Sequence, residues 1–413
     1  MRRTRRRRHR ATQVVAALHA STTRRCGPTS QQQPTTATRS SSRQCPYSPV
    51  ACFSPILPVI PRVGEDEPPP SWDPVLTPKG GVHGQSFLPS LKKMSRRMKL
   101  ACLQLVMVAF LATSVTMSSA GLQYNFYSSP CPNAEDTVRN VVYGLFDKDP
   151  TLPAALIRLL FHDCFVMGCD ASILLDPTKA NPQPEKTVIP LRGYDAINKI
   201  KAAVEAACPG KVSCADILAF AARDSVAKSA GFSFPIPSGR RDGTTSSAFS
   251  VFSNIPSPFF NAQDLINSFA SKNLGVDDLV ALSGAHSIGT ARCSGFTNRL
   301  YPTVDPALDP AYATQLKAAC PEGGPDNAVN NSPVSPGTLS NQYYHNAVDG
   351  RVLFTSDAAL MTRNDTEAWV RKNAADPTGW MVRFAASMVK MAAIEVLTGT
   401  QGEVRRFCNT TNS

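Results

Sequence analysis

The sequence contains few histidines. There are six among 413 residues, and the part that follows residue 120 has His162, His286 and His345. A zinc site built from cysteine and histidine needs two closely spaced ligand pairs. Cys164 and Cys169 form one such pair, but no second pair accompanies them. We therefore expect no zinc site, and zinc does not explain the three histidines after residue 120.

A membrane-spanning segment is also missing. The apolar run 100–115 is too short, and too interrupted by Gln104 and Thr113, to span a bilayer comfortably. Basic residues precede it at 92–99, and Ser118-Ser119-Ala120 follows it. This order is typical of a secretory signal peptide, provided that translation starts at Met94 or Met98. We therefore assign 98–120 as a signal peptide and expect no stable membrane insertion.

Acidic residues are scarce in the first 120 positions, which hold four of them against 18 Lys and Arg. The other 293 residues hold 27 acidic and 25 basic side chains, so the net charge of +12 belongs to the leader. A near-neutral globular part does not indicate nucleic acid as a partner. Residues 1–97 are basic, Pro-rich and without periodicity, which indicates disorder. We interpret them as an over-extended gene model, with a chloroplast-type transit peptide as the alternative.

Strand signals are weak after residue 120, and no internal repeat is present. The segments 176–192, 230–260 and 321–338 are Pro- and Gly-rich connections. The length suits one large domain, or two lobes around a cofactor. We predict a mostly α fold, because eleven segments have helical spacing or strong helix formers: 134–146, 152–165, 193–208, 213–229, 261–273, 276–283, 309–319, 340–348, 358–364, 366–375 and 378–396.

Eight cysteines follow residue 120, and an even number in a secreted chain predicts four disulfides. Spacing alone does not choose their pairing. Asn330, Asn364 and Asn409 stand in glycosylation sequons, which fit the secretory route.

The segment 158–172 concentrates reactive side chains. If its first part is helical, Arg158, Phe161 and His162 stand at i, i+3 and i+4 and share one face. Asp163 and Asp170 follow, so an imidazole, a fixed cation and a group of hard oxygen ligands fall within fifteen residues. This combination indicates chemistry rather than core packing.

His286 lies in a second apolar segment, 277–289, which ends in small residues. Gly284 and Ala285 would let a flat, bulky group approach the backbone closely. One imidazole on each of two apolar helices, one of them accompanied by Arg and Phe, is what a haem pocket needs. We therefore predict that one histidine binds haem iron and that the other acts on the opposite face.

Two sequence motifs around these histidines resemble those of a known family. Arg-x-x-Phe-His-Asp-Cys-Phe-Val-x-Gly-Cys-Asp-Ala-Ser at 158–172 and Asp-Leu-Val-Ala-Leu-Ser-Gly-Ala-His-Ser-Ile-Gly at 278–289 resemble the two haem motifs of secretory plant (class III) peroxidases. The resemblance extends over essentially 121–408. It implies a haem-peroxidase domain at 121–413, with two helical lobes around a b-type haem, iron protoporphyrin IX. It also implies the disulfides Cys131–Cys208, Cys164–Cys169, Cys214–Cys408 and Cys293–Cys320.

The residue types suggest roles within this resemblance. His162 would take a proton from hydrogen peroxide and return it to the departing oxygen. Arg158 would stabilise the developing charge, and Phe161 would restrict access. His286 would bind the iron, with Asp357 as the acceptor of its other ring nitrogen. Pro256 matches the family's residue at the edge where aromatic donors bind, although a rigid turn explains it equally well.

A calcium site is expected beside His162. Its oxygen ligands would come from Asp163, Asp170, Ser172, Glu185 and the backbone carbonyls of Val166 and Gly168. The site would fix the helix that carries His162.

Two departures from the family pattern matter. Between Glu185 and Arg192 the chain lacks the Asn that normally accepts a hydrogen bond from the distal histidine, so a carbonyl near 188–190 is the expected substitute. In 330–341 the two aspartates of the family's second calcium site are missing, and hydroxyls and amides stand there with Ser287. We expect calcium to bind this second site weakly or not at all.

The favoured function is a secreted haem peroxidase that reduces hydrogen peroxide and oxidises small phenolic donors. The expected location is the cell wall or the vacuole, and the expected state is a monomer. The first alternative is a haem-binding cell-wall protein whose activity is weakened by the missing Asn. The second is a hydrolase without haem that uses His162 and Asp163; it leaves Arg158 and His286 unexplained.

Overall fold

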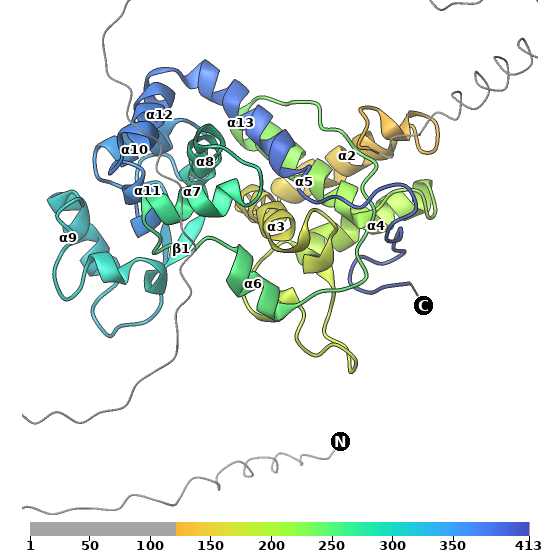
Figure 1. Ribbon diagram of the computed structural model, residues 1–413, viewed down its shortest axis with the longest axis horizontal. Coiled ribbons are helices and arrows are strands. Elements are labelled where there is room, and N and C mark those ends of the chain that lie inside the picture. Colours follow the sequence, from red (N-terminus) through yellow and green to blue (C-terminus); the bar gives the residue numbers. More distant parts are fainter. Residues whose placement is uncertain (1–120, 413) are drawn as a thin grey trace, which may run out of the picture. The chain divides into compact units, whose positions relative to one another are not determined.

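The computed structural model describes residues 121–412. The leader and signal segments assigned at 1–97 and 98–120 lie outside this range. Helices dominate the described part (Figure 1): α2 Ala134–Phe146, α3 Leu152–Met167, α4 Tyr194–Ala207, α5 Cys214–Ala230, α6 Ala248–Asn254, α7 Ala262–Ala270, α8 Val276–Ser283, α9 Pro310–Ala319, α10 Gln342–Val348, α11 Thr355–Ala359, α12 Asn364–Ala375 and α13 Pro377–Met391. The predicted mostly α fold is confirmed.

The strand content is small, as expected. Strands β1 (Thr290–Arg292) and β2 (Ala328–Asn330) pair antiparallel, with Ala291 opposite Val329. Strands of three residues are too short to display an alternating pattern, so this pair could not be predicted from local sequence.

Some predicted helix bounds were wrong. Helix α11 occupies Thr355–Ala359 rather than 358–364, and α13 ends at Met391 rather than at 396. Helix α6 was not predicted at all, because it falls inside the connection 230–260. Isolated helices this short are marginal in water, and packing against neighbours decides whether they form.

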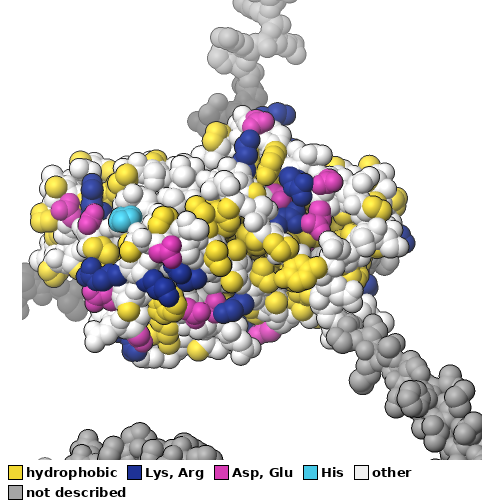
Figure 2. Space-filling model, turned by 90° about the horizontal axis from the view of Figure 1, so that it is seen from above, with side chains coloured by type: hydrophobic (Ala, Val, Ile, Leu, Met, Phe, Trp, Pro, Cys, Tyr) yellow, Lys and Arg dark blue, Asp and Glu magenta, His cyan; other side chains and the backbone are white. Residues whose placement is uncertain are grey.

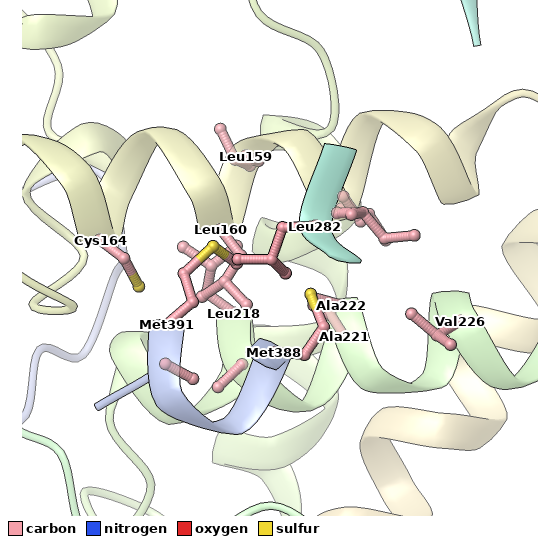
Figure 3. Packing of buried hydrophobic residues seen from close by; sticks show 14 of the residues in the cluster. Leu159, Leu160, Cys164, Leu218, Ala221, Ala222, Val226, Leu282, Met388 and Met391 are labelled. Carbon is pink, nitrogen blue, oxygen red and sulfur yellow. The ribbon is translucent and has the colours of Figure 1, made fainter. Parts of the chain in front are cut away.

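The main hydrophobic core lies between α3 and α5, which pack along their lengths, and is completed by α8 and α13. Each fully buried leucine there contributes about 1.5–3 kcal/mol of transfer free energy. A second, smaller core lies around α9. Figure 3 shows residues from all four main-core helices meeting, among them Leu160 and Cys164 of α3, Leu218 and Ala222 of α5, Leu282 of α8, and Met388 and Met391 of α13.

Four disulfides tie the helices together, and all have the pairing that the family resemblance implied: Cys131–Cys208, Cys164–Cys169, Cys214–Cys408 and Cys293–Cys320. The C-terminal segment is also held by Arg405, which is fully buried. Its guanidinium donates to the carbonyl oxygens of Ala171 at 2.7 Å and Cys408 at 2.7 Å. The end of the chain therefore supports the loop that follows α3.

Lys and Arg side chains alternate with Asp and Glu on the face shown in Figure 2, and neither sign forms a continuous field. This agrees with the nearly balanced charges after residue 120. Within 121–412, no helix is both long enough and apolar enough to cross a membrane.

Candidate active site

Helix α3 positions the first group of predicted site residues. Pro153 stands in its first turn, where a missing N–H costs nothing, and apolar residues continue to Val166. The helix stops at Gly168, whose φ is 89°; a β-carbon there would collide with the carbonyl oxygen of Glu395. Arg158 and His162, one turn apart on α3, lie on one face as the spacing predicted.

His162 is a buried, neutral base. The Nε of Arg158 donates a hydrogen bond to its Nε2 at 3.3 Å. Burial, and then the positive charge of Arg158, lower the pKa of His162 to about 3. The ring therefore stays uncharged at ordinary pH, and its Nε2 lone pair is the one that could take a proton. Phe161 meets the same ring edge-to-face, at 5.3 Å between centroids.

The other ring nitrogen of His162 does not have the expected partner. Within the described range, the imidazole has no hydrogen bond beyond the one from Arg158, and no carbonyl at 188–190 accepts from it. The substitute expected for the missing Asn was therefore wrong. Arg158 and the packing around a side chain that is 3% exposed hold the ring instead.

His286 lies in the short 3-10 helix η5 (Gly284–Ser287) directly after α8. Its Nδ1 is 2.9 Å from the carboxylate of Asp357 on α11, as predicted. The hydroxyl of Tyr343 on α10 donates to the same carboxylate oxygen at 2.8 Å. Three elements thus fix the orientation of one imidazole, and sequence reasoning missed Tyr343 because no local pattern marks it.

Electrostatics at His286 favour an electron-rich ring. Burial lowers the pKa of the imidazole, but the charge of Asp357 and its hydrogen bond outweigh burial, so the pKa is raised overall. The partner on Nδ1 leaves Nε2 as the nitrogen able to bind a metal. Gly284 does not serve the role suggested for it, since a β-carbon there would meet the Tyr344 hydroxyl and the Trp380 indole.

Arg158 acts electrostatically on both histidines. Its positive charge lowers the pKa of His162 and opposes the overall rise in the pKa of His286. Arg158 remains exposed, and the His286 side chain is 42% accessible, although burial by itself disfavours the charged form of each. An accessible imidazole whose Nε2 has no hydrogen bond within residues 121–412, together with a neutral imidazole and a guanidinium, fits a haem iron.

The predicted calcium ligands are gathered beside α3. The buried carboxylate of Asp163 accepts from Ala171 N at 3.0 Å, and that of Asp170 accepts from Ser172 N at 2.9 Å. Ser246 donates to Glu185 at 3.1 Å, a contact that sequence reasoning missed. The Cys164–Cys169 disulfide closes the loop that carries the Val166 and Gly168 carbonyls.

Burial dominates the electrostatics of these carboxylates, and the charge of Arg405 opposes it only in part at Asp170. Burial, followed by the charges of Asp170 and Glu185, raises the pKa of Asp163, and burial raises that of Glu185 to about 7. Ser172 Oγ and Glu185 Oε2 are buried without a hydrogen-bond partner. Across residues 121–412, no three His, Cys, Asp or Glu side chains lie close enough together to bind a metal by themselves. The carboxylates therefore need further oxygen ligands. Together with hydroxyl and carbonyl oxygens, however, they fit calcium.

The second expected calcium site contains no carboxylate. Ser287 Oγ accepts from Ser340 N at 3.0 Å, and Ser332 Oγ accepts from the Asn346 side chain at 3.2 Å. Asn331 Nδ2 donates to the Ile288 carbonyl at 2.9 Å. Protein hydrogen bonds occupy part of this polar set, whereas Asn331 Oδ1 and Ser335 Oγ are buried without a partner. All of these ligands are neutral, and neutral ligands alone bind calcium poorly.

Pro256 lies in the connection that leaves α6, where it is half-buried. Two residues later, the Pro258 carbonyl accepts from Ser356 N at 2.9 Å. This connection thus reaches the residue next to Asp357.

Comparison with known proteins decides the family. The peroxidase family model matches residues 138–376. Similar proteins include Peroxidase 5 of Vitis vinifera, 43% identical over 329 residues that cover 77% of this chain and 99% of the relative. Peroxidase 2 of Zea mays is 47% identical over 301 residues, covering 70% and 89%. The chain belongs to the plant peroxidase family. Peroxidase 12 of Arabidopsis thaliana is a further relative, 42% identical over 298 residues, covering 71% and 83%.

Family membership confirms the predicted enzyme class, a peroxidase of the secretory plant type. It implies haem as a cofactor, and hydrogen peroxide and an electron donor as substrates. The alternative of a haem-binding protein with weakened activity is not favoured.

Proposed function

We propose that this peroxidase binds iron protoporphyrin IX between His162 and His286 and uses hydrogen peroxide to oxidise small phenols. The observation that supports the proposal is a neutral imidazole bonded to a guanidinium, together with a second imidazole whose Nδ1 is bonded to a carboxylate. Each peroxide molecule takes two electrons and two protons from two phenols, which gives two water molecules and two phenoxyl radicals.

His162 moves the proton. Its Nε2 takes the proton from one oxygen of peroxide and returns it to the other oxygen as the O–O bond breaks. The low pKa keeps this nitrogen unprotonated and ready to accept. The bond from Arg158 orients the ring, in place of an acceptor for Nδ1.

Arg158 supplies a fixed positive charge, and Phe161, which packs against the His162 ring, would restrict access to a bound haem iron. The guanidinium is close enough to lower the pKa of His162, so it also stabilises negative charge on the departing oxygen. Because the Arg158 side chain is accessible, it can turn from His162 to peroxide without unfolding α3.

His286 would bind the haem iron through Nε2. Asp357 makes the ring a stronger electron donor, and Tyr343 holds that carboxylate in place. The haem, when bound, supplies the redox-active iron and accepts the electrons of the donor.

The calcium site would act on the position of His162. Asp163, the next residue along α3, is a proposed ligand, so a bound cation would fix that end of the helix. Ser172 and Glu185 offer the unpartnered oxygens that complete the set.

We further infer secretion through a signal peptide to the cell wall or vacuole, as a monomer with glycans at Asn330, Asn364 or Asn409. The four disulfides support an oxidising compartment.

The proposed activity is tested with haem-loaded protein, hydrogen peroxide and guaiacol. Peroxide-dependent formation of coloured product is expected. A haem-loaded protein that consumes no peroxide would refute the proposal, and one that consumes peroxide without oxidising phenols would restrict it to another donor.

The pH dependence follows from the pKa of His162. Because that pKa is about 3, the rate of reaction with peroxide should change less than about twofold between pH 8 and pH 4. It should fall only as the ring becomes protonated below that range. A histidine with an ordinary pKa would instead lose more than tenfold by pH 5. Stopped-flow absorbance measures the rate.

Metal analysis tests the calcium assignment. We expect one tightly held calcium ion per protein after dialysis, because one site has unpartnered carboxylate oxygen and the other has none. Glu185→Gln should weaken this binding, while Ser287→Ala should leave the content at one. Two tightly held ions in the wild type would contradict the assignment.

A further inference from the structure

Helix α6 and the connection after it expose aromatic rings. Phe249 and Phe252, three positions apart and therefore on one side of α6, are 78% and 75% exposed. Phe259, beyond the end of the helix, is 50% exposed. Single exposed apolar side chains are ordinary, but three exposed phenylalanines within eleven residues of sequence are an unusual concentration.

The chain around these rings carries no charge. Residues 243–263 contain no Lys, Arg, Asp or Glu, and the polar groups beside the rings are hydroxyls and amides such as Ser250, Ser253 and Asn254. The segment itself therefore offers a charged partner no ion pair. Flat rings with hydrogen-bonding groups around them instead suit an uncharged ligand that is itself aromatic and hydroxylated.

The location of α6 connects this surface to the active site. Helix α6 packs against α3, which carries Arg158 and His162, and lies beside it in Figure 1. At its other end, the connection is bonded through Pro258 to Ser356, the neighbour of Asp357. The segment 248–260 therefore connects the helix that carries His162 with the residue next to Asp357, the carboxylate bonded to His286.

We propose that Phe249, Phe252 and Phe259 form a docking surface for uncharged phenolic donors larger than one ring, such as the surface of a phenolic polymer. This rests on the proposed function and adds a determinant of substrate size to it. The rings would stack on the donor and hold one of its phenol groups near the edge marked by Pro256. That group then loses one electron and one proton, and the peroxide already named is the oxidant.

The test compares wild type with the double variant Phe249→Ser/Phe252→Ser. Both positions are exposed, so the fold should survive. Haem-loaded protein without peroxide is sedimented with particles of a coniferyl alcohol polymer, and the double variant should bind roughly tenfold more weakly. Its kcat/KM for guaiacol should stay within about twofold of wild type. The matched control is Phe407→Ser, a 58% exposed ring on the C-terminal segment, which should bind normally.

Equal binding of the double variant and wild type would overturn the docking surface. The proposal would also be overturned if the double variant lost as much binding to cellulose particles as to the phenolic polymer, because the surface would then bind carbohydrate. A wild-type dimer that the double variant dissociates in light scattering would show that a second copy covers the rings. Failure of wild type to oxidise guaiacol would refute the proposed function instead. The sedimentation result would still test the docking surface, because it is measured without peroxide.

Discussion

Replacing His162 with alanine should lower the rate of reaction with hydrogen peroxide by roughly 10²–10⁴-fold, the usual contribution of one positioned acid–base group. The reason is the position of Nε2, which is buried, neutral and directed at Arg158. Haem should still bind, because His286 and its carboxylate partner are untouched. Stopped-flow mixing of the haem-loaded variant with peroxide measures the rate, and the Soret band reports the haem content.

His345→Ala is the matched control, since this histidine is exposed on α10. The control should react like wild type. If His162→Ala and wild type reduced peroxide at equal rates, His162 would not be the base.

Replacing Arg158 with leucine should cost on the order of 10²–10³ in the same rate, equivalent to about 3–4 kcal/mol of transition-state stabilisation. Two losses combine here: the charge that would stabilise the departing oxygen and the hydrogen bond that orients His162. A second readout separates an electrostatic role from a structural one. The positive charge of Arg158 lowers the pKa of His162, so the variant's pH profile should shift to higher pH.

Arg158→Lys tests the geometry of the guanidinium, because it keeps a charge and loses the planar set of donors. It should fall between wild type and Arg158→Leu. Arg371→Leu, on the exposed side of α12, should have no effect. An Arg158→Leu variant with an unchanged rate and pH profile would remove this residue from the mechanism.

The long elements and the polar motifs could be predicted from the sequence. Helices α2 and α8 begin and end at the predicted residues. Helix α2 has several turns, and Gly275 marks the start of α8. The family resemblance supplied the disulfide pairing, which spacing could not. The family resemblance also identified the pair His286–Asp357, although the two residues are 71 positions apart.

Other features depend on contacts that no local pattern encodes. Helix α6 has seven residues, so its formation depends on packing against α3 rather than on periodicity. Tyr343 and Ser246 become part of the site only because folding brings them to carboxylates. The expected carbonyl partner of His162 was wrong, since the one hydrogen bond of this imidazole within residues 121–412 comes from Arg158.

A porphyrin bound between residues 162 and 286 should be detectable by titration with hemin. Purified wild-type protein should bind one hemin per chain and develop a Soret band, and His286→Ala should lose the axial imidazole signature while His345→Ala keeps it. A folded wild-type protein that remains colourless after reconstitution would contradict the account.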